Sequence, residues 1–387
     1  MFNPLGKTIR LLLAGFTMLA LASCQTNFPS AGGQGSGGGA VSVALLVPHG
    51  STSVEEQLLA RDLENAARLA ASDLSGVQID LRVYGTAGDA TQAQNAAIRA
   101  MDEGASIVVG PLHATSANAV AVAAAPRNVN VLAFSNNPTI AGGNLFVLGQ
   151  TFDTTADRLT DYAVSQGKRR IMTLHSDNVA GQLGRSAIAR AVSSRGAQSA
   201  GSVAYEFSQQ GVVGSVPTIR ATAQTNQADA IFLTANAAGA LPLFTQMLPE
   251  AGLSKEQIQY IGLARWDKPP QTLELPGVQD GWFAMPDPQR EAQFRNRFQS
   301  AHGNAPHALA GLSYDAIAAI GALAQSGNPD ALSRGSLLQP AGFQGVNGIF
   351  RFRPDGTTDR GLAVVTVRDS QLFILSPAPT SFGGSGF

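Results

Sequence analysis

The stretch VSVALLV, residues 41–47, decides the fold because it is an apolar run of strand length with almost no polar alternation. Such a run is typical of a strand that is buried on both faces. Pro48-His49-Gly50-Ser51 ends it, and Ser53 and Glu56 then form the S-x-x-E pattern that caps a helix N-terminus. The sequence therefore predicts a strand, a turn and a helix in succession.

This alternation continues along the chain and restarts after Gly149. Further strands are predicted at 77–84, 106–110, 130–134, 169–175, 203–207, 230–233, 259–263 and 282–285, with helices between them. A β pair is predicted from 348–353 and 362–368 around the turn Pro354-Asp355-Gly356. We expect an α/β fold of two doubly wound, Rossmann-like lobes with a hinge, and an interlobe cleft at the carboxyl ends of the strands.

The N-terminus has the pattern of a secretory signal. Lys7 and Arg10 precede the apolar run Leu11–Leu21, which is too short to span a bilayer. Leu21-Ala-Ser-Cys24 resembles the lipobox of bacterial lipoproteins, which implies that Cys24 is lipidated. Gln25 follows the cysteine, and in Gram-negative lipoproteins the lack of an aspartate there implies anchoring in the outer membrane, facing the periplasm.

Composition narrows the classes of function. The formal net charge is −1 and Cys24 is the only cysteine, so the sequence predicts neither a nucleic-acid-binding surface nor an intrachain disulfide. The histidines are scattered, which favours no metal site and no cofactor. Because G-x-S-x-G, P-loop and H-E-x-x-H motifs are missing from the sequence, we expect a protein that is not an enzyme.

Several landmarks occur in the order typical of one family. They are Val-Val-Gly110-Pro111-Leu112 before a helix with Ser116, the run Phe134-Ser135-Asn136-Asn137, the late Tyr314-Asp315-Ala316, and the turn at Asp355-Gly356. With these landmarks the chain resembles a type I periplasmic binding protein of the leucine/isoleucine/valine-binding kind. The resemblance covers roughly residues 41–376 and implies that fold, with a ligand held between the lobes.

The expected boundaries follow from the same comparison. Residues 1–23 are predicted to be a signal peptide and 24–40 the lipidated cysteine with a flexible linker. Residues 41–149 with about 283–342 are predicted to form lobe 1, and 150–282 with about 343–376 lobe 2. The last segment, 377–387, is predicted to be a disordered tail.

Binding residues are expected in the loops that follow the strands. Amino-acid binders of this family hold a carboxylate with hydroxyls and amides in lobe 1 and an ammonium with an acid in lobe 2. Ala114 stands where the family carries serine, so Thr115 or Ser116 is the substitute, and Asp267 suits an amine while Arg265 beside it suits an anion. Trp266 is either a stacking or a buried aromatic. The candidate ligand contacts are Ser51, Thr115, Ser116, Ser135, Asn137, Asp177, Asn236, Arg265, Trp266 and Asp267.

Two functions follow from these resemblances. The chain also resembles the C-terminal part of the penicillin-binding protein activator lipoproteins. The features that carry this resemblance are the lipobox, the flexible linker and Arg265-Trp266-Asp267 after a second-lobe strand. That resemblance implies a non-catalytic regulator of peptidoglycan synthesis whose partner is a peptidoglycan synthase. The alternative is an ABC-transporter substrate-binding protein, whose partners are a permease and an amino acid or similar small polar ligand.

Overall fold

The computed structural model describes residues 40–383. The predicted signal sequence, the lipidated Cys24 and most of the linker lie outside the described residues. Within 40–383, no helix is both long enough and apolar enough to cross a bilayer.

The first sheet is parallel and has the strand order β2-β1-β3-β4-β5. The predicted strand over 41–47 is confirmed as β1, and it pairs with β2 on one side and β3 on the other. The strands are β1 (Val41–Val47), β2 (Ile79–Gly85), β3 (Ile107–Val109), β4 (Asn130–Ala133) and β5 (Leu145–Val147).

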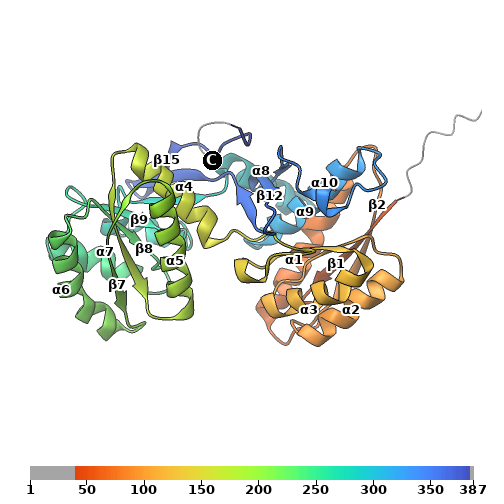
Figure 1. The fold of residues 1–387 in the computed structure, drawn as a ribbon, viewed down its shortest axis with the longest axis horizontal. Helices are drawn as coiled ribbons and strands as arrows, with labels where there is room; N and C mark the ends of the chain where they lie inside the picture. Colours follow the sequence, from red (N-terminus) through yellow and green to blue (C-terminus); the bar gives the residue numbers. More distant parts are fainter. Residues whose placement is uncertain (1–39, 384–387) are drawn as a thin grey trace, which may run out of the picture. The chain divides into compact units, whose positions relative to one another are not determined.

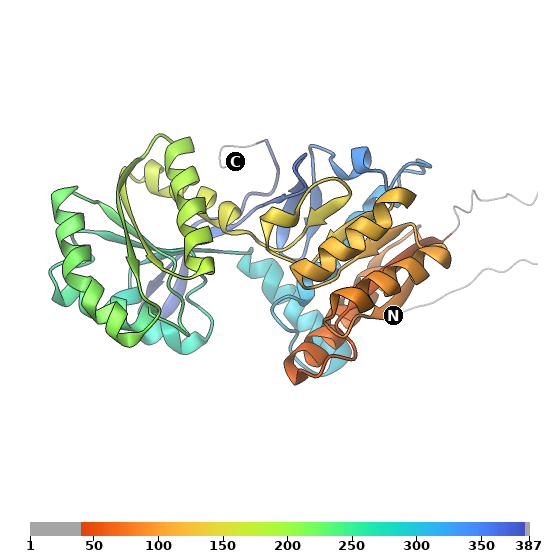
Figure 2. The same cartoon turned by 60° about the horizontal axis from the view of Figure 1, so that its bottom comes forward.

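Helices cover both faces of this sheet because successive strand residues point to opposite faces. Val43 and Leu45 pack with α1 (Val54–Asp73) and α9 (Ala310–Ala324). Ala44 and Leu46 pack with α2 (Ala90–Asp102) and α3 (Ala114–Ala124), which lie side by side on the other face (Figures 1 and 2). This is the doubly wound arrangement that the sequence predicts.

The second sheet has the order β15-β14-β10-β9-β8-β6-β7. Its strands from β7 to β10 are parallel, whereas β14 and β15 are antiparallel additions at one edge. The strands are β6 (Arg170–Ser176), β7 (Gln198–Tyr205), β8 (Ala230–Leu233), β9 (Gln259–Gly262), β10 (Trp282–Met285), β14 (Ala363–Arg368) and β15 (Gln371–Ser376).

Four helices cover the second sheet, two on each face. Those on one face are α4 (Phe152–Ser165) and α5 (Val179–Ser194), and those on the other are α6 (Gln209–Thr225) and α7 (Leu241–Glu250). Two further helices are α8 (Pro288–His302), which follows β10, and the short α10 (Arg334–Leu337), which follows α9. The described 3-10 turns have five residues or fewer and are η1 (Ala125–Arg127), η2 (Pro138–Ile140), η3 (Pro270–Glu274) and η4 (Pro276–Val278).

A third, three-stranded sheet corrects the predicted β pair. β12 (Gly348–Phe352) pairs with β11 (Phe343–Gly345) and with β13 (Thr358–Arg360). It does not pair with the predicted partner at 362–368, where residues 363–368 form β14 of the second sheet. The reason is local. The predicted turn at 354–356 forms, but the strand after it, β13, pairs with β12 over three residues only. The chain then continues into the second sheet as β14.

The boundaries differ from the expected ones at two places. Phe343, Phe350 and Phe352 belong to the core of the first sheet, although 343–376 was expected in lobe 2 as a whole. The C-terminal segment contacts the fold as far as Phe382, since Arg351 lies 4.5 Å from the Phe382 ring centroid and Pro377 accepts a hydrogen bond from Arg158. We use lobe 1 for the first and third sheets with their helices, and lobe 2 for the second sheet with its helices.

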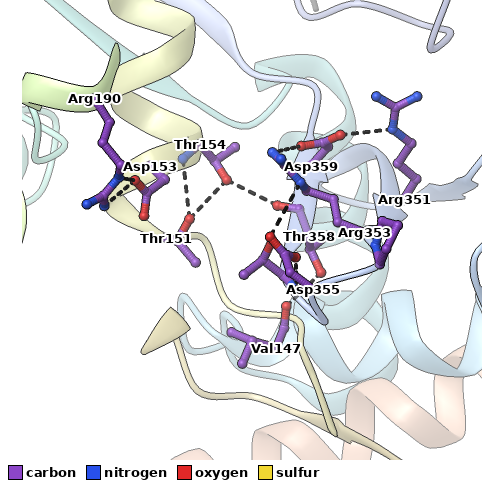
Figure 3. A network of polar contacts seen from close by, with 12 residues as sticks. Val147, Thr151, Asp153, Thr154, Arg190, Arg351, Arg353, Asp355, Thr358 and Asp359 are labelled. Carbon is purple, nitrogen blue, oxygen red and sulfur yellow. Dashed lines mark hydrogen bonds and ion pairs between the residues drawn. The ribbon is translucent and has the colours of Figure 1, made fainter. Parts of the chain in front are cut away.

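In the described chain the backbone crosses between the lobes three times: from β5 to α4, from β10 to α8, and from β13 to β14. The first and third crossings are joined by hydrogen bonds. Thr358 Oγ1 donates to the Val147 carbonyl (2.6 Å), and Thr154 Oγ1 donates to the Thr358 carbonyl (3.1 Å; Figure 3). Buried Arg360 donates to the Leu148 carbonyl through Nε and Nη2 and pairs with buried Asp315 (2.9 Å).

Candidate functional site

The lobe 1 half of the candidate site is built by the loops after β1, β3 and β4, which are adjacent strands. Because these strands are parallel, the loops meet at the same edge of the sheet. Of the five predicted residues here, three serve the local backbone. Ser51 Oγ accepts from the Ser53 amide (3.1 Å), Ser135 Oγ accepts from the Asn137 amide (3.1 Å), and Asn137 Oδ1 accepts from the Thr139 amide (3.0 Å).

The start of α3 is different, because its polar groups are not satisfied in this way. His113 occupies the N-cap position, and its side chain makes no capping hydrogen bond. Ser116 lies in the first turn and is 1% exposed, yet its Oγ has no hydrogen-bond partner. Thr115 is exposed. A helix N-terminus without a cap offers free amides and a positive dipole end, which suits an anionic group.

The capping-box prediction is half correct. Ser53 Oγ accepts from the Glu56 amide (3.4 Å), but the Glu56 carboxylate does not return to the Ser53 amide. It lies instead 2.9 Å from His113 Nε2. A second pair, His49 with Glu64, also has a separation of 2.9 Å. Neither histidine is among the ten candidate contacts. Each glutamate partner lies more than a helical turn away in the sequence, so no local pattern points to these pairs.

The lobe 2 loops carry the other five candidates. Asp177 and Asn236 are exposed. The helix after β6 is capped by Asn178, whose Oδ1 accepts from the Gly181 amide (2.9 Å), and not by Asp177. Trp266 is fully buried in the core of the second sheet, so the structure favours the buried role over stacking on a ligand.

Arg265 and Asp267 satisfy each other. Their side chains form two hydrogen bonds, Nε to Oδ1 at 2.8 Å and Nη2 to Oδ2 at 2.5 Å, and Arg265 Nη1 also contacts the Glu291 carboxylate at 3.2 Å. Burial lowers the pKa of the Arg265 guanidinium, but the hydrogen bonds to Asp267 and the charge of Glu291 outweigh burial and raise it above its ordinary value. Neither side chain is left free to bind an external charge.

Comparison with known proteins places the chain in a family. A protein-family model described as "Periplasmic binding protein" matches residues 40–371. A search of curated proteins found no match.

Solved structures with the same fold are similar over nearly their whole length. One is a putative branched-chain amino acid ABC transporter from Rhodospirillum rubrum, 18% identical, with a TM-score of 0.74 over 87% of this chain and 100% of that one. Another is an ABC transporter substrate-binding protein from Desulfitobacterium hafniense in complex with Leu, 18% identical, with a TM-score of 0.63 over 87% and 100%. A third is the leucine binding protein LivK from Thermotoga maritima MSB8, 17% identical, with a TM-score of 0.57 over 88% and 99%.

Proposed function

Because the chain belongs to the periplasmic binding protein family, we propose that it is a non-catalytic solute-binding protein for a small polar ligand, acting with an ABC permease. Two of the proteins whose structures it resembles are described as ABC-transporter proteins, one of them in complex with leucine. Fold alone does not assign a ligand. The proposal therefore rests on one observation of this chain, the unpartnered Ser116 hydroxyl.

A buried hydroxyl without a partner costs roughly 1–3 kcal/mol, and a ligand that gains access to the buried Ser116 Oγ and accepts a hydrogen bond from it recovers that cost. At the start of α3, the ligand atom that fits is a carboxylate or similar anionic oxygen, which the uncapped helix amides also attract. We infer a ligand with a carboxylate on the Ser116 side. The closed Arg265–Asp267 pair suggests that the rest of the ligand is not held by a free charge in the loop after β9.

The test compares Ser116→Ala with Ser106→Ala, an exposed serine just before β3. Thermal melting of the full chain is measured with L-leucine, L-isoleucine, L-valine, benzoate and muropeptides. A ligand at 100 times its Kd adds about 2.7 kcal/mol, a shift of a few degrees. We expect Ser116→Ala to lose most of the shift while its unliganded melting temperature stays at or above that of the parent chain.

A shift that survives in Ser116→Ala would contradict the role of Ser116. The absence of any shift across the panel would contradict the solute-binding proposal itself. Ser106→Ala is expected to match the parent chain in both measurements.

One observation favours a second candidate, the penicillin-binding protein activator. Asp267, the residue that would hold an ammonium, already has Arg265 as its partner, so the lobe 2 half of an amino-acid site is closed. A regulator that contacts a peptidoglycan synthase needs no ligand in this position. Co-purification with a penicillin-binding protein, together with no melting shift, is the result that would select this candidate.

The sequence motif at Cys24 supplies the proposed location for both candidates. A lipid on Cys24, followed by Gln25, would hold the domain at the periplasmic face of the outer membrane. Lipid anchoring of this kind relies on the acyl chains and not on a membrane-spanning helix.

A further inference from the structure

Two adjoining cavities lie between α4 and the loop that joins β12 to β13. Their volumes are about 400 and 540 Å³, and both are lined by Thr154, Asp157, Arg353 and Asp359. None of the ten predicted ligand contacts lines either cavity. The cavities touch the first and third crossings, whose polar network is drawn in Figure 3.

The arginines that line these cavities are already engaged. Arg158 donates to three neutral oxygens, those of Leu362, Ser376 and Pro377. The other arginines each pair with a carboxylate: Arg190 with Asp153, Arg195 with Asp161, Arg351 and Arg353 with Asp359, and Arg360 with Asp315.

Asp157 is the exception among the lining carboxylates. Its side chain makes no hydrogen bond and no ion pair with any described residue, although Asp153, Arg195, Arg353 and Asp359 surround it. Burial raises the pKa of this carboxyl above its ordinary value. Arg195 and Arg353 lower the pKa of Asp157 from a distance, but no cation among residues 40–383 contacts its carboxylate directly. A partly buried carboxylate without a direct partner is costly, so this position favours an external positive group.

The size and walls of the cavities decide which cation fits. Metal ions such as Ca²⁺ need six or more oxygen ligands, and residues 40–383 contain no group of three or more acidic, histidine or cysteine side chains suited to a metal. The volumes lie within the range of small-molecule sites. Leu338, Pro340 and Phe352 add apolar wall beside Asp157, which suits an organic body.

We propose that these cavities form a second binding site, separate from the carboxyl edge of the sheets, for a small organic amine. Its protonated nitrogen donates to the Asp157 carboxylate, and its apolar body lies against Phe352 and Leu338. The ligand would touch α4 of lobe 2 and the β12–β13 loop of lobe 1 together.

The experiment titrates the full chain with benzylamine, and with benzyl alcohol as the neutral analogue, at pH 7.5. Amide ¹H–¹⁵N NMR shifts are followed. We expect benzylamine to shift the amides of α4 and of residues 353–359, and benzyl alcohol to bind at least about tenfold more weakly, as the loss of a charged hydrogen bond predicts.

Variants assign the effect to one carboxylate. Asp157→Asn is expected to weaken benzylamine binding by about tenfold or more, while Asp369→Asn, an exposed acid in the β14–β15 turn, leaves it unchanged. A melting temperature of Asp157→Asn at or above that of the parent chain excludes unfolding as the cause. Ser116→Ala should leave these shifts intact, so this proposal and the solute-binding proposal fail independently.

Three results would overturn the assignment: no amide shifts with benzylamine at millimolar concentration, equal binding of benzyl alcohol, or unchanged binding by Asp157→Asn.

Discussion

A single carboxyl group, that of Asp157, lies among four charged side chains without pairing with any of them. Because burial raises its pKa in the folded protein, the folded state binds the proton more tightly than the unfolded chain does. The stability that this proton binding contributes is fully present below the ordinary aspartate pKa of about 3.9 and is lost as the pH rises through the folded pKa.

Asp157→Asn cannot ionise, so it should not lose this stability at neutral pH. We expect its free energy of unfolding, relative to the parent chain, to be higher at pH 7 and to converge toward the parent value as the pH falls to about 4. Urea denaturation at both pH values measures this difference. A gain of equal size at the two pH values would show that the pKa of Asp157 is not the cause.

At the residue scale, sequence reasoning located polar positions but not their roles. Ser51, Ser135 and Asn137 do follow the expected strands, and the structure uses their oxygens to close local turns. Turn formation and ligand binding call for the same residue types at the same places, so a single sequence could not separate them. The spacing of Asp153, Asp157 and Asp161 on one face of α4 was the available signal for the second cavity site.

At the scale of single elements, the loop after β9 shows why Trp266 is a core residue. Its ring lies against Gly262, the last residue of β9, and against Gly281, so closely that an added Cβ at either glycine would overlap the indole. The Trp266 side chain thus fits in the core because Gly262 and Gly281 have no side chains.

Gly262→Ala should therefore destabilise the protein by about 1–3 kcal/mol, the usual cost of overpacking a core. The matched control is Gly214→Ala in α6, where nothing lies within 4 Å of the added Cβ. There we expect a gain of about 0.4–1 kcal/mol, because alanine restricts the unfolded chain more than glycine does. Chemical denaturation measures both, and a neutral Gly262→Ala would show that Trp266 can move aside.

Elements with continuous apolar runs were predicted well, whereas β5, β11, β13 and β15 were not predicted. The strands at 41–47, 230–233 and 282–285 match β1, β8 and β10, since burial on both faces leaves a clear pattern. β11 and β13 have three residues each, too few for any periodicity to appear. Their pairing depends on where β12 lies, which is a tertiary contact.

At the scale of the whole molecule, the buried pair of Asp315 and Arg360 connects α9 to the third crossing. Asp315 also accepts from the Val346 amide (2.7 Å), and Arg360 reaches the Leu148 carbonyl at the first crossing. Tyr314-Asp315 was noticed in the sequence, but its partner lies 45 residues away and no local pattern points to it.

Arg360→Met leaves the Asp315 carboxylate buried without a cation, and we expect a loss of about 3–5 kcal/mol. Asp315→Asn in the same chain removes that charge and keeps an acceptor for the Val346 amide. The double variant should therefore lose less than the two single variants together, with a coupling of about 0.5–3 kcal/mol in a denaturation cycle. Additive losses would mean that Arg360 acts through the Leu148 carbonyl alone.

The packing of α9 and the third sheet onto the first sheet has a consequence for how the protein is made. The core around Leu45 is complete only when Ile317 and Phe350 are in place, and both are translated after all of the strands β6 to β10. Contacts of such long sequence separation are slow to form and cannot form at all on a partly synthesised chain. Lobe 2 waits as well, because its sheet takes β14 and β15 from the end of the chain, so neither lobe can complete its core before synthesis is nearly finished.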